Sequence, residues 1–78
     1  MQEEQIVTEE GMAALAMRFR MQAKKTRAQA ARDMGVAQTS IFHAEESPTQ
    51  SLLKLRMRMI EAYSPYHVVG PVYHLKKK

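Results

Sequence analysis

Hydrophobic residues recur at helical spacing in the first part of the chain. Met12, Leu15 and Phe19 lie three or four residues apart, which is the period of a helix that buries one face. Thr8 precedes this run and is a good N-cap, because its hydroxyl accepts a hydrogen bond from a free backbone amide of the first turn. The pattern predicts a first helix over about residues 9–24.

Two shorter helices are expected next. Thr26 and Gln29 have the spacing of a capping box, in which each side chain binds the backbone amide of the other residue. Gly35 tolerates the positive φ at which many helices end. We therefore expect a second helix between Thr26 and Gly35, and a third over about residues 38–46 that ends at Ser47-Pro48.

The segment 50–63 admits two interpretations. Its apolar residues fall on one helical face, whereas residues 53–59 alternate between apolar and basic, as in a strand. Leu, Met, Lys and Arg are helix formers, and no β-branched residue appears in the segment before Ile60. We expect a helix over about residues 50–63, capped by Thr49 or Ser51.

The C-terminal residues 66–75 are rich in Tyr and Val, which favours a strand. Gly70-Pro71 interrupts them, and Pro lacks the amide that a central strand needs. The segment is an edge strand, a strand with a bulge, or two short strands. Gln5-Ile6-Val7 is a further candidate for a brief strand.

Three positions in the middle of the chain have the spacing of a helix-turn-helix. Ala31 is small enough for two helices to cross closely, Gly35 permits a tight turn, and Ile41 falls on the inward face of the next helix. The alternative is any antiparallel helix pair that ends at a glycine. The expected fold is mainly α, with four short helices that contain the helix-turn-helix, followed by a C-terminal β-strand. The expected division of the chain is an acidic lead at 1–8, a helix-turn-helix domain at 9–63, and a strand with a basic tail at 64–78.

The charge is unevenly distributed along the chain. Residues 1–10 contain four of the eight Asp+Glu and no base, so the rest of the chain has 12 Lys+Arg against four acids. A small body with this excess suits a polyanion, most often nucleic acid. The alternative is that the charge only keeps a small protein in solution.

Other kinds of chemistry have little support. The chain has no Cys, its only Asp is Asp33, and His67 and His74 would face opposite sides of an uninterrupted strand. We therefore expect no catalytic residues, no metal site, no cofactor and no enzymatic activity. No apolar run is long enough to span a membrane, and the acidic N-terminus is unlike a targeting peptide. We expect a cytoplasmic, nucleoid-associated protein.

Residues 26–45, TRAQAARDMGVAQTSIFHAE, resemble the phage repressor/Cro-type (Xre-like) helix-turn-helix family. Leu15, Phe19 and Arg20 upstream and residues 48–55 downstream extend the resemblance. The acidic lead, the four helices and the final strand are also similar to small antitoxin-repressors. The resemblance implies a homodimer that binds a palindromic operator on double-stranded DNA through the major groove, as a transcriptional repressor. The alternatives are an antitoxin-type module that mainly binds a toxin protein, and a nonspecific nucleic-acid binder.

The resemblance also implies roles for individual residues. The N-terminal part of the recognition helix meets base edges in this docking geometry, so base contacts are expected from Gln38, Thr39 and His43. Phosphate contacts are expected from Arg27, Ser40, Lys24 and Lys25. Solvated side chains, and for Arg27 a neighbouring carboxylate, are the structural alternatives.

Two further expectations concern structure. In the family, the positions of Arg20 and Glu45 often form a buried ion pair between the first and third helices. Ala37 stands where the family prefers a Ser or Thr N-cap, and Phe42 stands where a polar residue is usual, so Phe42 contacts either a thymine methyl group or another protein.

The C-terminal strand is the expected dimer joint. A lone edge strand exposes unpaired backbone groups, and pairing with its own copy would satisfy them. The alternatives are pairing with Gln5-Ile6-Val7 of the same chain, or with a toxin. The residues expected at the joint are Val68, Val69, Val72, Tyr73 and Leu75.

Overall fold

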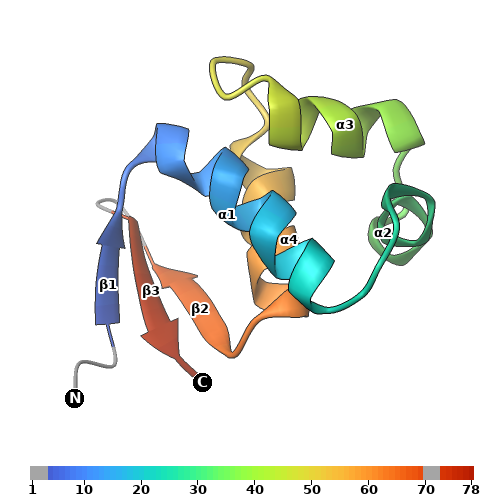
Figure 1. Ribbon diagram of the computed structural model, residues 1–78. Coiled ribbons are helices and arrows are strands. Elements are labelled where there is room, and N and C mark those ends of the chain that lie inside the picture. The colour runs from blue at the N-terminus through green and yellow to red at the C-terminus, as the bar shows by residue number, and fades with distance from the viewer. Residues whose placement is uncertain (1–3, 70–72) are drawn as a thin grey trace.

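The computed structural model describes residues 4–69 and 73–78. Figure 1 shows the helices with a small sheet at one end of them, and α2 lies on the side away from the sheet. The fold is mainly helical, as predicted. In chain order the elements are β1 (Glu4–Val7), α1 (Glu9–Gln22), α2 (Arg27–Met34), α3 (Gln38–Glu46), α4 (Leu53–Tyr63), β2 (Tyr66–Val69) and β3 (Tyr73–Lys77).

The first three helices begin as their sequence signals predict. The Thr8 hydroxyl accepts a hydrogen bond from the Gly11 amide at 3.0 Å and caps α1. Thr26 and Gln29 form the reciprocal capping box at 2.8 and 3.1 Å. Ala37 stands at the N-cap of α3 with no side-chain hydrogen bond, so that helix begins without the cap that a Ser or Thr would supply.

The turns between these helices use left-handed backbone. Gly35 ends α2 at φ 70°, the conformation for which glycine is suited. The α1–α2 turn contains Lys24 at φ 60°, an uncommon value for a residue with a side chain. α1 ends at Gln22 and not at Lys24 as expected, because the chain turns there towards α2.

α4 is a helix, so the strand interpretation of residues 53–59 was wrong. It begins at Leu53, later than expected, and neither Thr49 nor Ser51 occupies its N-cap. The preceding residues form a compact turn instead, in which the Gln50 amide donates to the Ser47 carbonyl at 2.9 Å.

The C-terminal segment contains two short strands, which is one of the three arrangements that its sequence left open. β2 and β3 are antiparallel, and β3 also pairs with β1, which gives the order β1-β3-β2. Val7 lies opposite Tyr73, and Val69 lies opposite His74. Pairing of the C-terminal segment with the N-terminal strand of the same chain, the alternative above, is therefore the observed arrangement.

The core lies between α1, α4 and the inner face of the sheet. Leu75 is fully buried and Val68 is 8% exposed, and Phe19 packs against Tyr66 with ring centroids 6.0 Å apart. The remaining buried hydrophobic residues come mainly from the helices: Met12, Ala13, Ala16, Ala30, Ala31, Met34, Ile41, Ala44, Leu55, Met59 and Ile60.

This packing corrects the expected dimer joint. Val68 and Leu75 point into the chain's own core, and Tyr73 is on the central strand, whose two edges are both paired. Val69 is 41% exposed, and Val72 lies outside the described residues. The C-terminal strand β3 is therefore no lone edge, and the outer strands of the described sheet are β1 and β2.

Candidate nucleic-acid interface

α3 is attached to the other helices through one face. Ile41 and Ala44 are fully buried, Glu45 is 5% exposed, and α3 contacts α1, α2 and α4. The opposite face exposes Gln38, Thr39 and Phe42 to solvent. In Figure 1, α3 runs along the outer edge of the helices, far from the sheet. One face of α3 is therefore packed against the other helices, and its opposite face is exposed to solvent.

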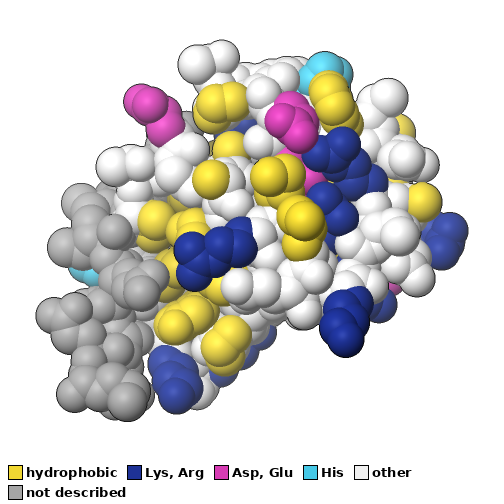
Figure 2. Space-filling model, in the orientation of Figure 1, with side chains coloured by type: hydrophobic (Ala, Val, Ile, Leu, Met, Phe, Trp, Pro, Cys, Tyr) yellow, Lys and Arg dark blue, Asp and Glu magenta, His cyan; other side chains and the backbone are white. Residues whose placement is uncertain are grey.

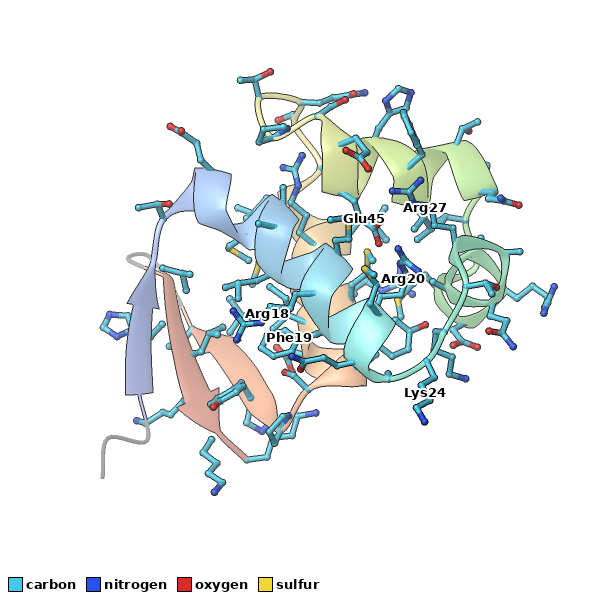
Figure 3. The ribbon with its side chains drawn as sticks, in the orientation of Figure 1. Arg18, Phe19, Arg20, Lys24, Arg27 and Glu45 are labelled. Atoms are coloured by element: carbon cyan, nitrogen blue, oxygen red, sulfur yellow. The ribbon has the colours of Figure 1, made fainter. Side chains whose placement is uncertain are left out.

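The predicted ion pair between Arg20 and Glu45 is present. Nε of Arg20 lies 2.5 Å from one oxygen of Glu45, and Nη2 lies 3.0 Å from the other. Nη1 of Arg20 donates to the Lys25 carbonyl at 2.8 Å, which ties the α1–α2 turn to the same centre. Figure 3 shows the two side chains meeting between α1 and α3. The pair thus fixes α3 relative to α1.

Arg27 is also bound to carboxylates. Its Nε donates to Glu45 at 2.9 Å and its Nη2 donates to Glu46 at 2.7 Å. The hydrogen bond to Glu45 has the larger effect and that to Glu46 the smaller, and both raise the pKa of Arg27 above its ordinary value. The structural alternative to the phosphate contact is therefore the observed state of this side chain. A phosphate would have to compete with Glu46, whose side chain is the more exposed of the two carboxylates.

A shallow groove on this surface combines the start of α2 with the exposed face of α3. Its lining residues are Arg27, Gln38, Thr39 and Phe42. Phe42 is 44% exposed, and the Arg27 guanidinium carbon lies 5.1 Å from its ring centroid. We name these residues the α3 groove. Gln38 and Phe42 lie one helical turn apart, so they share a face.

The other predicted contact residues lie outside this groove. His43 is half-buried, and its Nδ1 lies 3.3 Å from the Ser47 hydroxyl. Ser40 lines a different depression, between the α2–α3 turn and α4. Nζ of Lys25 lies 3.5 Å from Asp33, and Lys24 projects away from α3 in Figure 3.

Two arginines of α4 have structural roles that the sequence did not reveal. Arg56 is fully buried and donates to the carbonyls of Ala44, Ser47 and Gln50 at 2.7–2.9 Å. Arg58 donates to the Met34 carbonyl at the end of α2, at 2.7 Å. Cations are favoured at helix C-termini, so Arg58 stabilises the C-terminal end of α2 and Arg56 stabilises that of α3. The alternation of apolar and basic residues in α4 gave no signal for this.

Basic side chains on the face of Figure 2 are spread from the sheet to α2, with hydrophobic side chains between them. No continuous basic patch is visible on that face. Glu45 and Glu46, two of the four acids already counted against the basic residues, bind Arg20 and Arg27 within the fold, so the uncompensated positive charge is carried by the other basic side chains.

The described residues contain neither a cluster of metal-binding side chains nor a membrane-spanning helix. In residues 4–69 and 73–78, no three His, Asp or Glu side chains gather at one place where an ion could be held. Among the same residues, no helix combines the length and the apolar character needed to cross a bilayer.

Searches of protein-family models, curated proteins and solved structures found no match to this chain.

Proposed function

We propose that the protein is a sequence-specific regulator of transcription that binds double-stranded DNA with α3 in the major groove. The observation that carries this proposal is the exposed first turn of α3 on a helix whose other face is buried and ion-paired. A major groove of B-DNA is wide enough to admit one α-helix. A displayed helix of fixed orientation, preceded by a short helix and a tight turn, is the element that such docking requires.

Two side chains of that turn are suited to reading bases. The Gln38 amide can pair with N6 and N7 of adenine, and Thr39 offers a hydroxyl and a methyl group. Arg27 stands beside them at the start of α2, where the preceding helix crosses the DNA backbone in this mode of docking. Once it is released from Glu46, its guanidinium can bind a phosphate.

The proposal includes a homodimer on a palindromic operator and repression by occupancy of that site. One short helix reads only a few base pairs, and two copies related by a two-fold axis double the site. Because β3 is paired on both sides, the copies are expected to meet through another surface. The dimer acts in the cytoplasm, on the nucleoid.

The test is selection of bound duplexes from a randomised library by the full chain, at about physiological salt. We expect enrichment of a palindrome with half-sites about one helical turn apart. Gln38→Ala should then relax the preference at one position of each half-site, whereas Gln22→Ala, at another exposed glutamine, should leave it unchanged. Binding without enrichment would indicate a nonspecific binder, in which charge alone acts, and no binding would overturn the proposal.

A second candidate function is an antitoxin-type module that binds a toxin protein, with DNA binding secondary. Phe42 and Met21 favour it, because they are 44% and 59% exposed and large exposed apolar side chains often mark protein contacts. Co-expression with the product of an adjacent gene tests it. A stoichiometric complex that Phe42→Ala disrupts would support this candidate over the first.

A further inference from the structure

The aromatic ring in the α3 groove is held in place although it is exposed. The Arg27 guanidinium stacks over Phe42 at 5.1 Å from the ring centroid, and the His43 ring approaches it edge-on at 5.4 Å and 76°. Arg27 is itself fixed by Glu45 at 2.9 Å and Glu46 at 2.7 Å. A ligand that contacts the ring would therefore not have to order it first, which lowers the cost of binding.

While Glu45 and Glu46 bind Arg27, the electrostatics of the groove do not favour an anion. Arg27 is its only cation, and two carboxylates already bind that cation. The remaining lining consists of an amide, a hydroxyl with its methyl group, and a phenyl ring, from Gln38, Thr39 and Phe42. The groove is thus suited to a small apolar group with a hydrogen-bonding neighbour.

We propose that the α3 groove binds the 5-methyl group of a thymine, packed against Phe42 and the Thr39 methyl, beside a base that Gln38 reads. The inference rests on the proposed function and specifies which base the site recognises. Thymine is the base that presents an apolar group in the major groove of unmodified DNA, and phenylalanine is among the side chains that contact it. Phe42 then serves as a specificity determinant.

The test replaces thymine by uracil, one position at a time, in the duplex that the selection enriches. Uracil keeps every hydrogen-bonding group and lacks only the methyl group. Burying one such group corresponds to about a fourfold change in affinity. We expect one thymine in each half-site to show this loss on replacement, and the same replacement to weaken binding by Phe42→Ala clearly less, because only the Thr39 methyl group then remains beside the thymine methyl.

Two further variants make the test specific. Phe42→Leu keeps an apolar contact and should retain part of the sensitivity to uracil, and Met21→Ala removes an exposed apolar residue of α1 and should retain all of it. Thermal unfolding of each variant confirms that it is folded, which is expected because Phe42 is 44% exposed.

The outcomes separate this inference from the proposed function. A wild-type protein with a clear sequence preference but no sensitivity to uracil at any position would overturn the inference alone. Equal sensitivity of the wild type and Phe42→Ala would also overturn it, because the methyl group would then lie against another side chain. A wild-type protein without any sequence preference would overturn the proposed function itself.

Discussion

Arg20 and Glu45, 25 residues apart in the chain, form a two-point ion pair in which the carboxylate side chain is fully buried. The same carboxylate also accepts a hydrogen bond from Arg27. One acidic group thus joins α1, the start of α2 and α3. Since α3 carries the candidate recognition residues, this group sets the orientation of the candidate site.

The first prediction concerns Glu45→Gln. The substitution keeps the shape of the side chain but leaves Arg20 buried without its counter-charge, and breaking such a pair costs about 3–5 kcal/mol. A chain of 78 residues has a total stability on the order of 4–12 kcal/mol. Urea denaturation should therefore show that the free energy of unfolding of the variant is lower by about 3–5 kcal/mol, which is a large part of the total.

Glu46→Gln is the matched control for this measurement. Its carboxylate side chain is 45% exposed and pairs with Arg27 at the surface, so its loss should cost less than about 1 kcal/mol. Equal effects of the two substitutions would show that burial of Glu45 does not decide the stability.

The second prediction concerns Arg56→Met. Met replaces the aliphatic part of the arginine side chain but donates no hydrogen bond, so the carbonyls of Ala44, Ser47 and Gln50 lose a charged donor. Leaving buried polar groups unsatisfied costs about 1–3 kcal/mol for each group. We expect a loss of several kcal/mol in chemical denaturation, whereas Lys54→Met, at an exposed position of the same helix, should change stability by less than about 0.5 kcal/mol. Similar losses for both variants would contradict the structural role of Arg56.

Local signals in the sequence were sufficient for the helices before α4. The caps at Thr8 and Thr26 and the turn at Gly35 depend on residues only a few positions away, so the sequence pattern contains all the participants. The start of α4 was predicted too early because Thr49 and Ser51 are residue types that commonly cap helices. The chain instead uses 47–52 for a turn whose carbonyls Arg56 binds.

Non-local contacts account for the other differences. The pairing of Val7 with Tyr73 joins the two ends of the chain, and no short pattern encodes it. In the candidate site, the ion pair between Arg20 and Glu45 was predicted from the sequence resemblance to the repressor/Cro-type family and not from a local pattern. The binding of Arg27 by two carboxylates, and its stacking on Phe42, depend on the packing of α2 against α3.

The third prediction concerns the pH dependence of stability on the alkaline side. The Tyr63 hydroxyl donates to Asp33 at 2.6 Å, and burial together with this carboxylate raises the pKa of Tyr63 above its ordinary value of 10.0. A group whose pKa is raised by folding contributes stability that is fully present below its unfolded pKa. That contribution is lost as the pH rises through the folded pKa.

Absorbance at phenolate wavelengths measures this transition directly. The difference between the titration curves of the wild type and Tyr63→Phe should isolate one tyrosine that ionises above pH 10.0, the ordinary value for tyrosine. The stability difference between the two proteins should shrink at higher pH. A difference curve centred at or below the ordinary value would contradict the hydrogen bond to Asp33.

The last prediction concerns the competition between Glu46 and DNA for Arg27. Glu46→Gln removes the more exposed of the two carboxylates that bind this guanidinium. If DNA binding is the function, Nη2 of Arg27 then reaches a phosphate without first breaking the ion pair with Glu46, and each phosphate neutralised steepens the dependence of log affinity on log salt by about 0.9. The variant should bind the selected duplex more tightly at low salt and with this steeper slope. Glu61→Gln is the matched control, because it raises the net charge equally but lies beside His67, next to the sheet. Equal gains for both variants would mean that overall charge acts alone and that Glu46 does not restrain Arg27.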